Sequence, residues 1–297
     1  MSLTSFLVRR AFKKGDDIRD KGLTVPENIE RRVGIVYGSN KDWNLLDVYR
    51  PKGTTEKLPV IVSIHGGGWT YGDKDRYQYY CMDLASRGYA VVNFTYRLAP
   101  EYKFPAGMED TNQVFQWIFD NDEWFDLEHI YGVGDSAGGN MLSIYATMTG
   151  NEEYASAVGL TLPKTASDET FKFAAVGLHC GAYEIKTFGE NAFTRALMRD
   201  LFTNKGQPEE IAMMCPVPFI KDYFPPAYVI TANKDFLCGP PAQVGLVNRL
   251  KEIGCPHEDR TYGDAEKPLG HVFHLDIRSE AAKLCNDDVV AFFKKYE

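Results

Sequence analysis

Residues 134–138 read Gly-Asp-Ser-Ala-Gly and stand between an apolar run, 129–133, and a helix-like segment, 140–148. This is the G-x-S-x-G pattern, in which a serine occupies a sharp turn from a strand into a helix and exposes its hydroxyl. Glycines suit such a turn because they add no Cβ atom between the strand and the helix. The pattern predicts that Ser136 is a nucleophile.

The same residues fit two other interpretations. One is a turn of small residues without chemistry. The other is a dinucleotide-binding turn, because Gly132, Gly134 and Ala137 have its spacing and the acids Glu152 and Glu153 follow. That fingerprint normally occupies the first strand–helix turn of its domain, whereas several strand-like runs precede it here. The rest of a hydrolytic site, if present elsewhere in the chain, decides between the interpretations.

A glycine loop supplies the next part of such a site. Residues 58–64 read as a buried strand and lead into His-Gly-Gly-Gly-Trp at 65–69. Acyl transfer needs backbone N–H groups that face the oxyanion of the tetrahedral intermediate, and losing one such donor typically costs ~10²–10³ in rate. No Gly-Lys-Ser/Thr follows, so the loop is not a phosphate loop. Together with the serine turn, the loop favours acyl transfer.

The acid and base are expected later in the chain, in the order serine, acid, histidine. Residues 227–232 read as a strand, and Asp235 lies just beyond its carboxyl end. His271 follows the next strand-like run, 258–262. Functional groups of α/β sheets gather at the carboxyl ends of the strands. The sequence therefore predicts a catalytic triad of Ser136, Asp235 and His271.

Two rivals stay open at this stage. Asp264 is closer in sequence to the histidine loop and is the chief alternative acid, and His274 lies one helical turn after His271. His65 adjoins the glycine loop, where we expect its ring to hold the loop in shape by hydrogen bonds. The remaining histidines begin or end strands and are expected to be structural.

Four motifs in order carry a resemblance to a known family. They are His-Gly-Gly-Gly-Trp at 65–69, Tyr-Arg-Leu-Ala-Pro-Glu at 96–101, Phe-Pro-Ala at 104–106 with Glu109 and Asp110, and Gly-Asp-Ser-Ala-Gly-Gly at 134–139. In these the chain resembles the hormone-sensitive-lipase-like carboxylesterases, which have the α/β-hydrolase fold. The likeness extends from about residue 35 to the C-terminus.

The resemblance implies roles for individual residues. It implies the same triad, and it implies that the oxyanion is held by the backbone N–H groups of Gly67, Gly68 and Ala137. Trp69 stands where the family more often has a small residue or phenylalanine, which leaves the size of the acyl pocket open. No organic cofactor and no metal is implied, because no cluster has ligand spacing.

Composition and charge indicate which classes of partner and which cellular location to expect. Of the 297 residues 44% are hydrophobic, which is enough for a sheet covered on both faces in one domain spanning 1–297. The formal net charge of −8 disfavours the binding of nucleic acid. The six cysteines show no Cys-x-x-Cys spacing, which indicates small buried residues in a reducing compartment. No convincing signal peptide and no run of ~20 apolar residues is present. We therefore expect a cytoplasmic protein, and a monomer or a homodimer fits the sequence equally well.

Strand-like and helix-like runs alternate along the chain, which predicts a mostly parallel eight-stranded sheet with helices on both faces, the α/β-hydrolase fold. Strands are expected at 32–37, 44–49, 58–64, 90–95, 130–134, 173–179, 227–232 and 258–262, the first two as an antiparallel hairpin. Helices are expected near 75–86, 108–121, 140–148, 243–253 and 279–295.

Two segments fall outside this alternation. Residues 1–30 have an amphipathic pattern, and residues 183–224 form a long connection between two core strands. Long insertions in compact domains are often lids or binding loops. We expect both to cover the serine turn, with simple packing on the sheet edge as the alternative.

Five aromatic side chains near the expected strand ends are candidates for the substrate pocket: Trp69, Tyr71, Tyr183, Phe236 and Phe273. Packing in the core or lid is the alternative for each. A narrow pocket favours acetyl to butyryl esters, and an open one admits aryl or sugar esters. The expected activity is ester hydrolysis of a small molecule. The alternatives are an arylformamidase, a serine peptidase and a non-catalytic ligand-binding relative.

Overall fold

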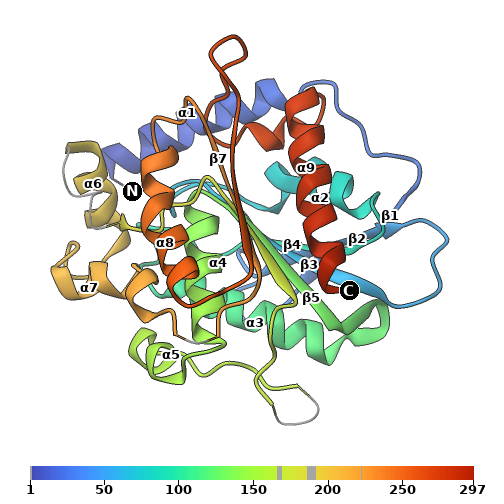
Figure 1. The fold of residues 1–297 in the computed structure, drawn as a ribbon, viewed down its shortest axis with the longest axis horizontal. Helices are drawn as coiled ribbons and strands as arrows, with labels where there is room; N and C mark the ends of the chain where they lie inside the picture. The colour runs from blue at the N-terminus through green and yellow to red at the C-terminus, as the bar shows by residue number, and fades with distance from the viewer. Residues whose placement is uncertain (1, 166–168, 186–191, 222) are drawn as a thin grey trace.

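The computed structural model describes residues 2–165, 169–185, 192–221 and 223–297, and its centre is an eight-stranded sheet (Figure 1). The strands are β1 (Ile29–Val36), β2 (Leu45–Pro51), β3 (Leu58–Ile64), β4 (Ala90–Phe94), β5 (Phe125–Asp135), β6 (Ala175–His179), β7 (Ala227–Ala232) and β8 (His257–Tyr262). Their order in the sheet is β1-β2-β4-β3-β5-β6-β7-β8. β1 and β2 form the expected antiparallel hairpin, β2 also pairs antiparallel with β4, and all other neighbours are parallel. The predicted α/β-hydrolase sheet is confirmed.

Helices pack on both faces of this sheet. They are α1 (Leu3–Arg19), α2 (Lys74–Ala85), α3 (Ala106–Asp120), α4 (Ala137–Met148), α5 (Glu152–Val158), α6 (Ala192–Leu201), α7 (Pro208–Met213), α8 (Val244–Glu252) and α9 (Glu280–Phe293). Helices α2 and α9 cover one face, and α3, α4 and α8 cover the other. The sheet is therefore the middle of three layers.

The sequence of strand β3 requires helices on both faces of the sheet. Val60, Val62 and Ile64 belong to the hydrophobic core beneath α3, α4 and α8, whereas Ile61 belongs to the core beneath α2 and α9. Successive side chains of a strand point to opposite faces, and all four of these side chains are fully buried. A run of apolar residues without polar alternation is typical of a parallel strand covered on both sides.

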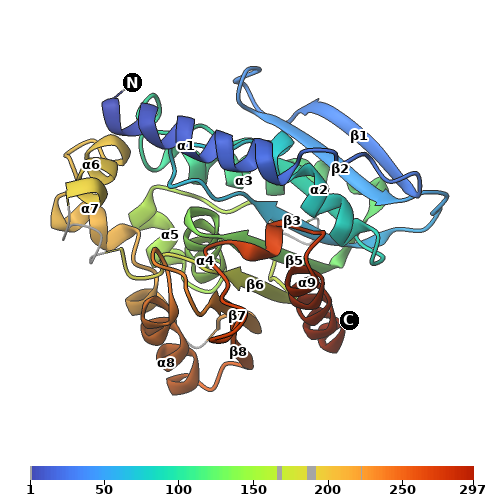
Figure 2. The ribbon, with the colours of Figure 1, turned by 90° about the horizontal axis from the view of Figure 1, so that it is seen from above.

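Helix α1 crosses the carboxyl ends of the strands, with α6 at one of its ends (Figure 2). The hydroxyls of Ser2 and Ser5 both donate to the carboxylate of Asp200 in α6. Ser2 also caps α1, because its side chain accepts the N–H of Ser5 at 3.0 Å. The N-terminal segment and the 183–224 connection are thus joined to each other above the sheet.

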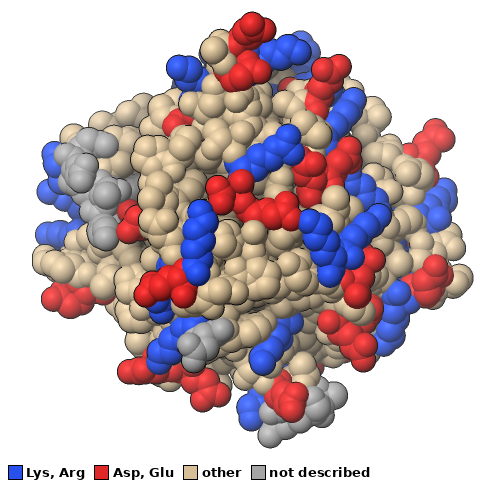
Figure 3. Space-filling model, in the orientation of Figure 1, with Lys and Arg blue, Asp and Glu red and all other residues tan. Residues whose placement is uncertain are grey.

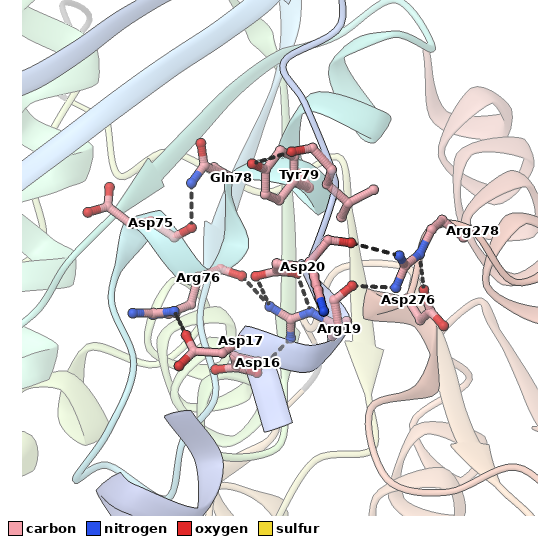
Figure 4. A network of polar contacts seen from close by, with 12 residues as sticks. Asp16, Asp17, Arg19, Asp20, Asp75, Arg76, Gln78, Tyr79, Asp276 and Arg278 are labelled. Carbon is pink, nitrogen blue, oxygen red and sulfur yellow. Dashed lines mark hydrogen bonds and ion pairs between the residues drawn. The ribbon is translucent and has the colours of Figure 1, made fainter. Parts of the chain in front are cut away.

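The other end of α1 is fixed by charged groups (Figure 4). Arg19 binds Asp16 and Asp20 of its own segment and donates to the backbone carbonyl of Arg76 in α2 at 2.6 Å. Arg278, which precedes α9, donates to the backbone carbonyls of Lys21 and Arg19. Both ends of α1 are therefore anchored to other parts of the fold.

The boundaries of some elements differ from the expectations. β5 begins at Phe125, earlier than expected, because Phe125 and Asp126 pair with Leu58 and Pro59 at the start of β3. Glu152 and Glu153 lie exposed in the first turn of α5 and not at a strand end, which contradicts the dinucleotide interpretation. Within the 183–224 connection, residues 186–191 and 222 lie outside the described residues.

Candidate active site

The turn from β5 into α4 holds Ser136 in a strained backbone conformation. Its φ is 51° and its ψ is −118°, a region that L-residues rarely adopt and that costs of order 1–3 kcal/mol. Two glycines make the turn sterically feasible. A Cβ on Gly134 would lie 2.6 Å from the Gly138 carbonyl oxygen, and one on Gly138 would lie 2.0 Å from that of Ile64. The turn presents Ser136 at the amino end of α4, as the G-x-S-x-G pattern predicts.

Ser136, His271 and Asp235 form a continuous hydrogen-bonded chain. Ser136 Oγ lies 2.9 Å from His271 Nε2, and His271 Nδ1 lies 2.7 Å from Asp235 Oδ2. With the proton on Nδ1, the ring donates to the carboxylate and its Nε2 accepts from the serine. The structure therefore brings together the three residues that the sequence predicts as a triad.

The second oxygen of Asp235 is also occupied. Asp235 Oδ1 accepts the backbone N–H groups of Leu237 at 2.9 Å and Cys238 at 2.8 Å. Burial raises the pKa of Asp235, but the hydrogen bonds from His271 and these amides outweigh it, so the pKa lies below the ordinary value. The carboxylate is thus stabilised in its charged form beside the imidazole.

The loops that carry Asp235 and His271 are tied together by Asn233. Its side-chain oxygen accepts the N–H of Leu269 at 2.9 Å, and its amide donates to the carbonyl of Asp264 at 2.8 Å. Val272, next to His271, has a left-handed backbone with φ of 52°. These contacts place the imidazole of His271 over Ser136, although His271 follows β8 and Ser136 follows β5.

The alternative acid, Asp264, and the alternative base, His274, make other contacts. The side chain of Asp264 accepts the N–H groups of Glu266 and Lys267 within its own exposed turn. His274 is fully buried with its ring 4.6 Å from that of His179, and burial lowers its pKa well below the ordinary value. It is therefore a neutral core residue, and neither rival contacts the serine.

The glycine loop lies beside the serine turn in a backbone conformation that favours glycine. The φ angles are 119° at Gly67 and 59° at Gly68, and Trp69 follows with 58°. A Cβ on Gly67 would lie 2.1 Å from the carbonyl oxygen of Tyr71. In the described part of the chain, the N–H groups of Gly67 and Gly68 donate to no other residue. Ala137 is the first residue of α4, where an N–H has no partner within the helix.

His65 stabilises the loop from below, as its position in the sequence predicts. Its Nδ1 lies 2.7 Å from the Gly66 carbonyl oxygen, and its ring stacks on Tyr96 at 4.1 Å. Burial lowers the pKa of His65 to about 4, so the ring is neutral at physiological pH. Sequence reasoning did not identify the neighbours Tyr77 and Asp135, which hydrogen-bond to each other beneath the same loop.

Two cavities meet at Ser136. The larger, of about 550 Å³, is lined by His271, Gly67 and residues of α1, and the smaller, of about 220 Å³, is lined by Gly68, Ala137 and Leu197. Both are lined by Phe12 of α1, which belongs to the amphipathic segment 1–30 that we expect from the sequence to cover the serine turn. Helix α1 thus lines both cavities, and α6 lines the smaller one.

The five aromatic candidates for the pocket are distributed unequally. Tyr71 and Phe273 line the larger cavity, Trp69 lines the smaller one, and Phe236 lines both with 86% of its surface exposed. Tyr183 is fully buried, packs beside Gly181 and lines neither cavity. Its expected place in the pocket is therefore wrong, because the chain turns inward directly after β6.

One group of potential metal ligands occurs among the described residues. Cys180, Asp235 and His271 offer ligand atoms that lie within 4.8 Å of one another. Asp235 and His271 already hydrogen-bond to each other, and burial raises the pKa of the Cys180 thiol well above its usual value. The donor set is therefore better suited to orienting an imidazole than to holding a cation. All six cysteines are buried and reduced.

On the face in Figure 3, acidic and basic side chains of the described residues are interspersed, without a broad basic patch. None of the described helices is both long and apolar enough to cross a bilayer.

The sheet and the serine turn define an α/β-hydrolase-fold protein. The model of the BD-FAE family matches residues 46–250, more than half of the chain. The chain belongs to the BD-FAE family, which confirms the resemblance to hormone-sensitive-lipase-like members of this fold.

Two curated relatives agree with this assignment, and a solved structure has the same fold. Esterase LipC of Mycobacterium tuberculosis is 30% identical over 254 residues, covering 82% of this chain and 60% of the relative. Carboxylesterase NlhH of the same organism is 38% identical over 109 residues, covering 34% of this chain and 33% of the relative. The match thus spans about a third of NlhH's length. A crystal structure of inhibited esterase B from Lactobacillus rhamnosis has the same fold, with a TM-score of 0.87, 24% identity and coverage of 99% of this chain and 97% of that one.

Proposed function

We propose that the protein is a serine carboxylesterase that hydrolyses small esters through an acyl-enzyme intermediate. The observation that carries this proposal is the hydrogen-bonded chain from Asp235 through His271 to Ser136, at 2.7 and 2.9 Å. A nucleophile, a base within hydrogen-bond reach and a group that orients the base are the parts that acyl transfer requires. The esterase names of the relatives are consistent with it.

The first half of the reaction forms the acyl-enzyme. His271 Nε2 takes the proton from Ser136 Oγ as that oxygen attacks the ester carbonyl, and Asp235 stabilises the imidazolium that results. The oxyanion accepts hydrogen bonds from the N–H groups of Gly67, Gly68 and Ala137. The amino end of α4 adds a partial positive charge at the same place.

The second half releases the products. His271 gives its proton to the leaving alkoxide, and the alcohol departs. Water then attacks the acyl carbon while His271 takes one of its protons. The bond from that carbon to Ser136 Oγ breaks as His271 returns the proton to Oγ, and the carboxylic acid leaves. No step needs a metal or an organic cofactor.

The walls of the site support a preference for short acyl chains. The smaller cavity measures about 220 Å³ and is lined by Trp69 and by Leu197 of α6, which favours acetyl to butyryl groups. We further propose that α1 and the described part of the 183–224 connection act as a lid over one catalytic domain. Aryl or sugar esters remain compatible with the larger cavity.

Hydrolysis of p-nitrophenyl esters from acetate to dodecanoate tests this proposal. We expect rapid turnover that peaks at short chains, a loss of ~10⁶ in kcat in Ser136→Ala, and no loss in Ser156→Ala, whose serine is exposed on α5. Absence of turnover on every chain length would contradict ester hydrolysis and favour a formamide or peptide substrate, or a ligand-binding protein.

A further inference from the structure

His271 distinguishes the two cavities at Ser136. It lines the larger cavity together with Val272 and Phe273, whereas it is not among the described residues that line the smaller one. The proposed function requires His271 to give a proton to the leaving oxygen, so the leaving alcohol departs on the imidazole's side. The larger cavity therefore receives the alcohol, and the smaller one receives the acyl group. This assignment rests on the proposed function.

The wall of the larger cavity that α1 supplies contains a carboxylate. Asp16 Oδ1 accepts from Arg19 Nη1 at 2.8 Å, and Asp16 Oδ2 accepts from the Tyr71 hydroxyl at 2.7 Å. All three residues line the cavity, and the Asp16 side chain is 17% exposed. A carboxylate has about four lone-pair sites, so each oxygen retains the capacity to accept one more hydrogen bond.

The guanidinium of Arg19 already makes most of the hydrogen bonds that it can donate. Of its five N–H groups, Arg19 directs one to Asp16, two to Asp20 and one to the carbonyl of Arg76. The described residues that line the larger cavity include one guanidinium, that of Arg19, and three carboxyl groups, those of Asp16, Asp135 and Asp276. The cavity therefore accepts hydrogen bonds readily and disfavours a second anion.

The position of Asp16 does not depend on a ligand. The network in Figure 4 holds the last turn of α1 against α2 through the pair of Arg76 and Asp17 at 2.7 Å and against the segment before α9 through Arg278. Tyr71 is fixed as well, because its N–H donates to the Gly67 carbonyl at 3.0 Å within the glycine loop. A polar group that is held in place before binding costs little ordering free energy when it is used.

We propose that Asp16 is a specificity-determining residue. Its carboxylate, oriented by Tyr71 and Arg19, accepts a hydrogen bond from a hydroxyl on the leaving alcohol and repels leaving groups that carry a carboxylate. The preferred substrates are thus short-chain esters of uncharged, hydroxyl-bearing alcohols. An alkyl ester of the same size reacts without this contact.

Three butyrate esters with three-carbon alcohols test the proposal: the esters of 1-propanol, of glycerol at its first carbon, and of 3-hydroxypropanoate. For the wild type we expect kcat/KM to be about tenfold higher for the glyceryl ester than for the propyl ester, as a hydrogen bond to a charged group predicts. The 3-hydroxypropanoate ester is expected to react slowest. In Asp16→Asn the glyceryl advantage falls about tenfold, and the penalty on the charged ester shrinks.

Asp17→Asn is the matched control. Asp17 neighbours Asp16 on α1 and pairs with Lys13 and Arg76, yet it does not line the larger cavity. If Asp16 served only to anchor α1, both variants would change all three esters alike, and the proposal would be overturned. A wild type without preference for the glyceryl ester would also overturn it, even if Asp16→Asn failed to fold. Failure to hydrolyse any of the three esters would instead refute the proposed function itself.

Discussion

The Tyr77 hydroxyl donates a hydrogen bond of 2.8 Å to Oδ2 of Asp135, the residue before the nucleophile. The same hydroxyl accepts the N–H of Gly66 at 2.8 Å, so one buried phenol joins the serine turn to the glycine loop. All three residues lie beneath the place where the oxyanion is proposed to form. The spacing between nucleophile and oxyanion donors therefore depends on a residue of α2 whose hydroxyl bonds to Gly66 and Asp135.

Tyr77→Phe is expected to lower both stability and turnover. The substitution leaves the Gly66 N–H and the Asp135 carboxyl without their partner in a buried place, which costs about 1–3 kcal/mol. We expect kcat to fall while KM changes little, because the displaced groups act on the transition state. Tyr79→Phe is the control, since Tyr79 also lies on α2 but donates to the Leu23 carbonyl far from the loop. Unchanged kcat in Tyr77→Phe, measured with p-nitrophenyl butyrate, would contradict this role.

Asp135 is expected to make the fold less stable at neutral than at acidic pH. Burial raises the pKa of Asp135 to about 6 from 3.8, although the hydrogen bond from Tyr77 opposes the rise. The folded protein holds this proton more tightly than the unfolded chain. The contribution to stability is therefore complete below pH 3.8 and is lost as the pH rises through about 6.

Asp135→Asn removes this titration. Between pH 4 and pH 7 the wild type should lose about 2–3 kcal/mol of unfolding free energy relative to the variant, from roughly two pKa units at 1.36 kcal/mol each. Urea unfolding of both proteins at several pH values measures the difference. Parallel stability curves for the two proteins would show that the carboxyl does not titrate in this window.

Asp235→Asn is expected to reduce kcat by about 10⁴, the effect of the equivalent change in a serine protease triad. The asparagine removes the negative charge that stabilises the imidazolium and favours the wrong tautomer of His271. Asp264→Asn is the matched control, because the Asp264 side chain accepts the backbone N–H groups of Glu266 and Lys267 in its own turn. If steady-state hydrolysis showed the larger loss in Asp264→Asn, the assignment of the acid would be wrong.

Phe12→Ala is expected to broaden the range of acyl chains. Phe12 lines both cavities and packs edge-on against Tyr71 at 5.8 Å between ring centres, so its removal joins the two spaces. We expect kcat/KM for octanoate to rise relative to acetate. Phe6→Ala, at an exposed position of the same helix, should leave the profile unchanged. An unaltered profile in both variants would refute the lid role of α1.

Most of the fold follows from local sequence signals. Apolar strands such as residues 58–64 and the glycines around Ser136 specify the parallel sheet and the serine turn, because burial on both faces and steric crowding leave few alternatives. The predicted triad residues are adjacent in space because all three follow strands of one parallel sheet. Their catalytic roles, the oxyanion donors, a cytoplasmic location and the choice between monomer and homodimer stay predictions.

The parts that the sequence does not reveal depend on contacts between distant segments. Asp16 enters the larger cavity because α1 is anchored to α6, α2 and the segment before α9, and no local pattern encodes those partners. Tyr183 was expected in the pocket from its place after β6, but the direction of the chain there buries it. Helix periodicity indicates that residues 1–30 have an apolar face. Periodicity alone does not indicate which residues that face covers.

Covalent labelling tests directly whether Ser136 is the activated nucleophile. The protein is treated with an alkyl p-nitrophenyl phosphonate, and intact mass and peptide mapping locate the adduct. We expect one adduct per chain, on Ser136, absent in Ser136→Ala and formed far more slowly in His271→Ala. Undiminished labelling of Ser136→Ala, or a wild type that does not react at all, would contradict it.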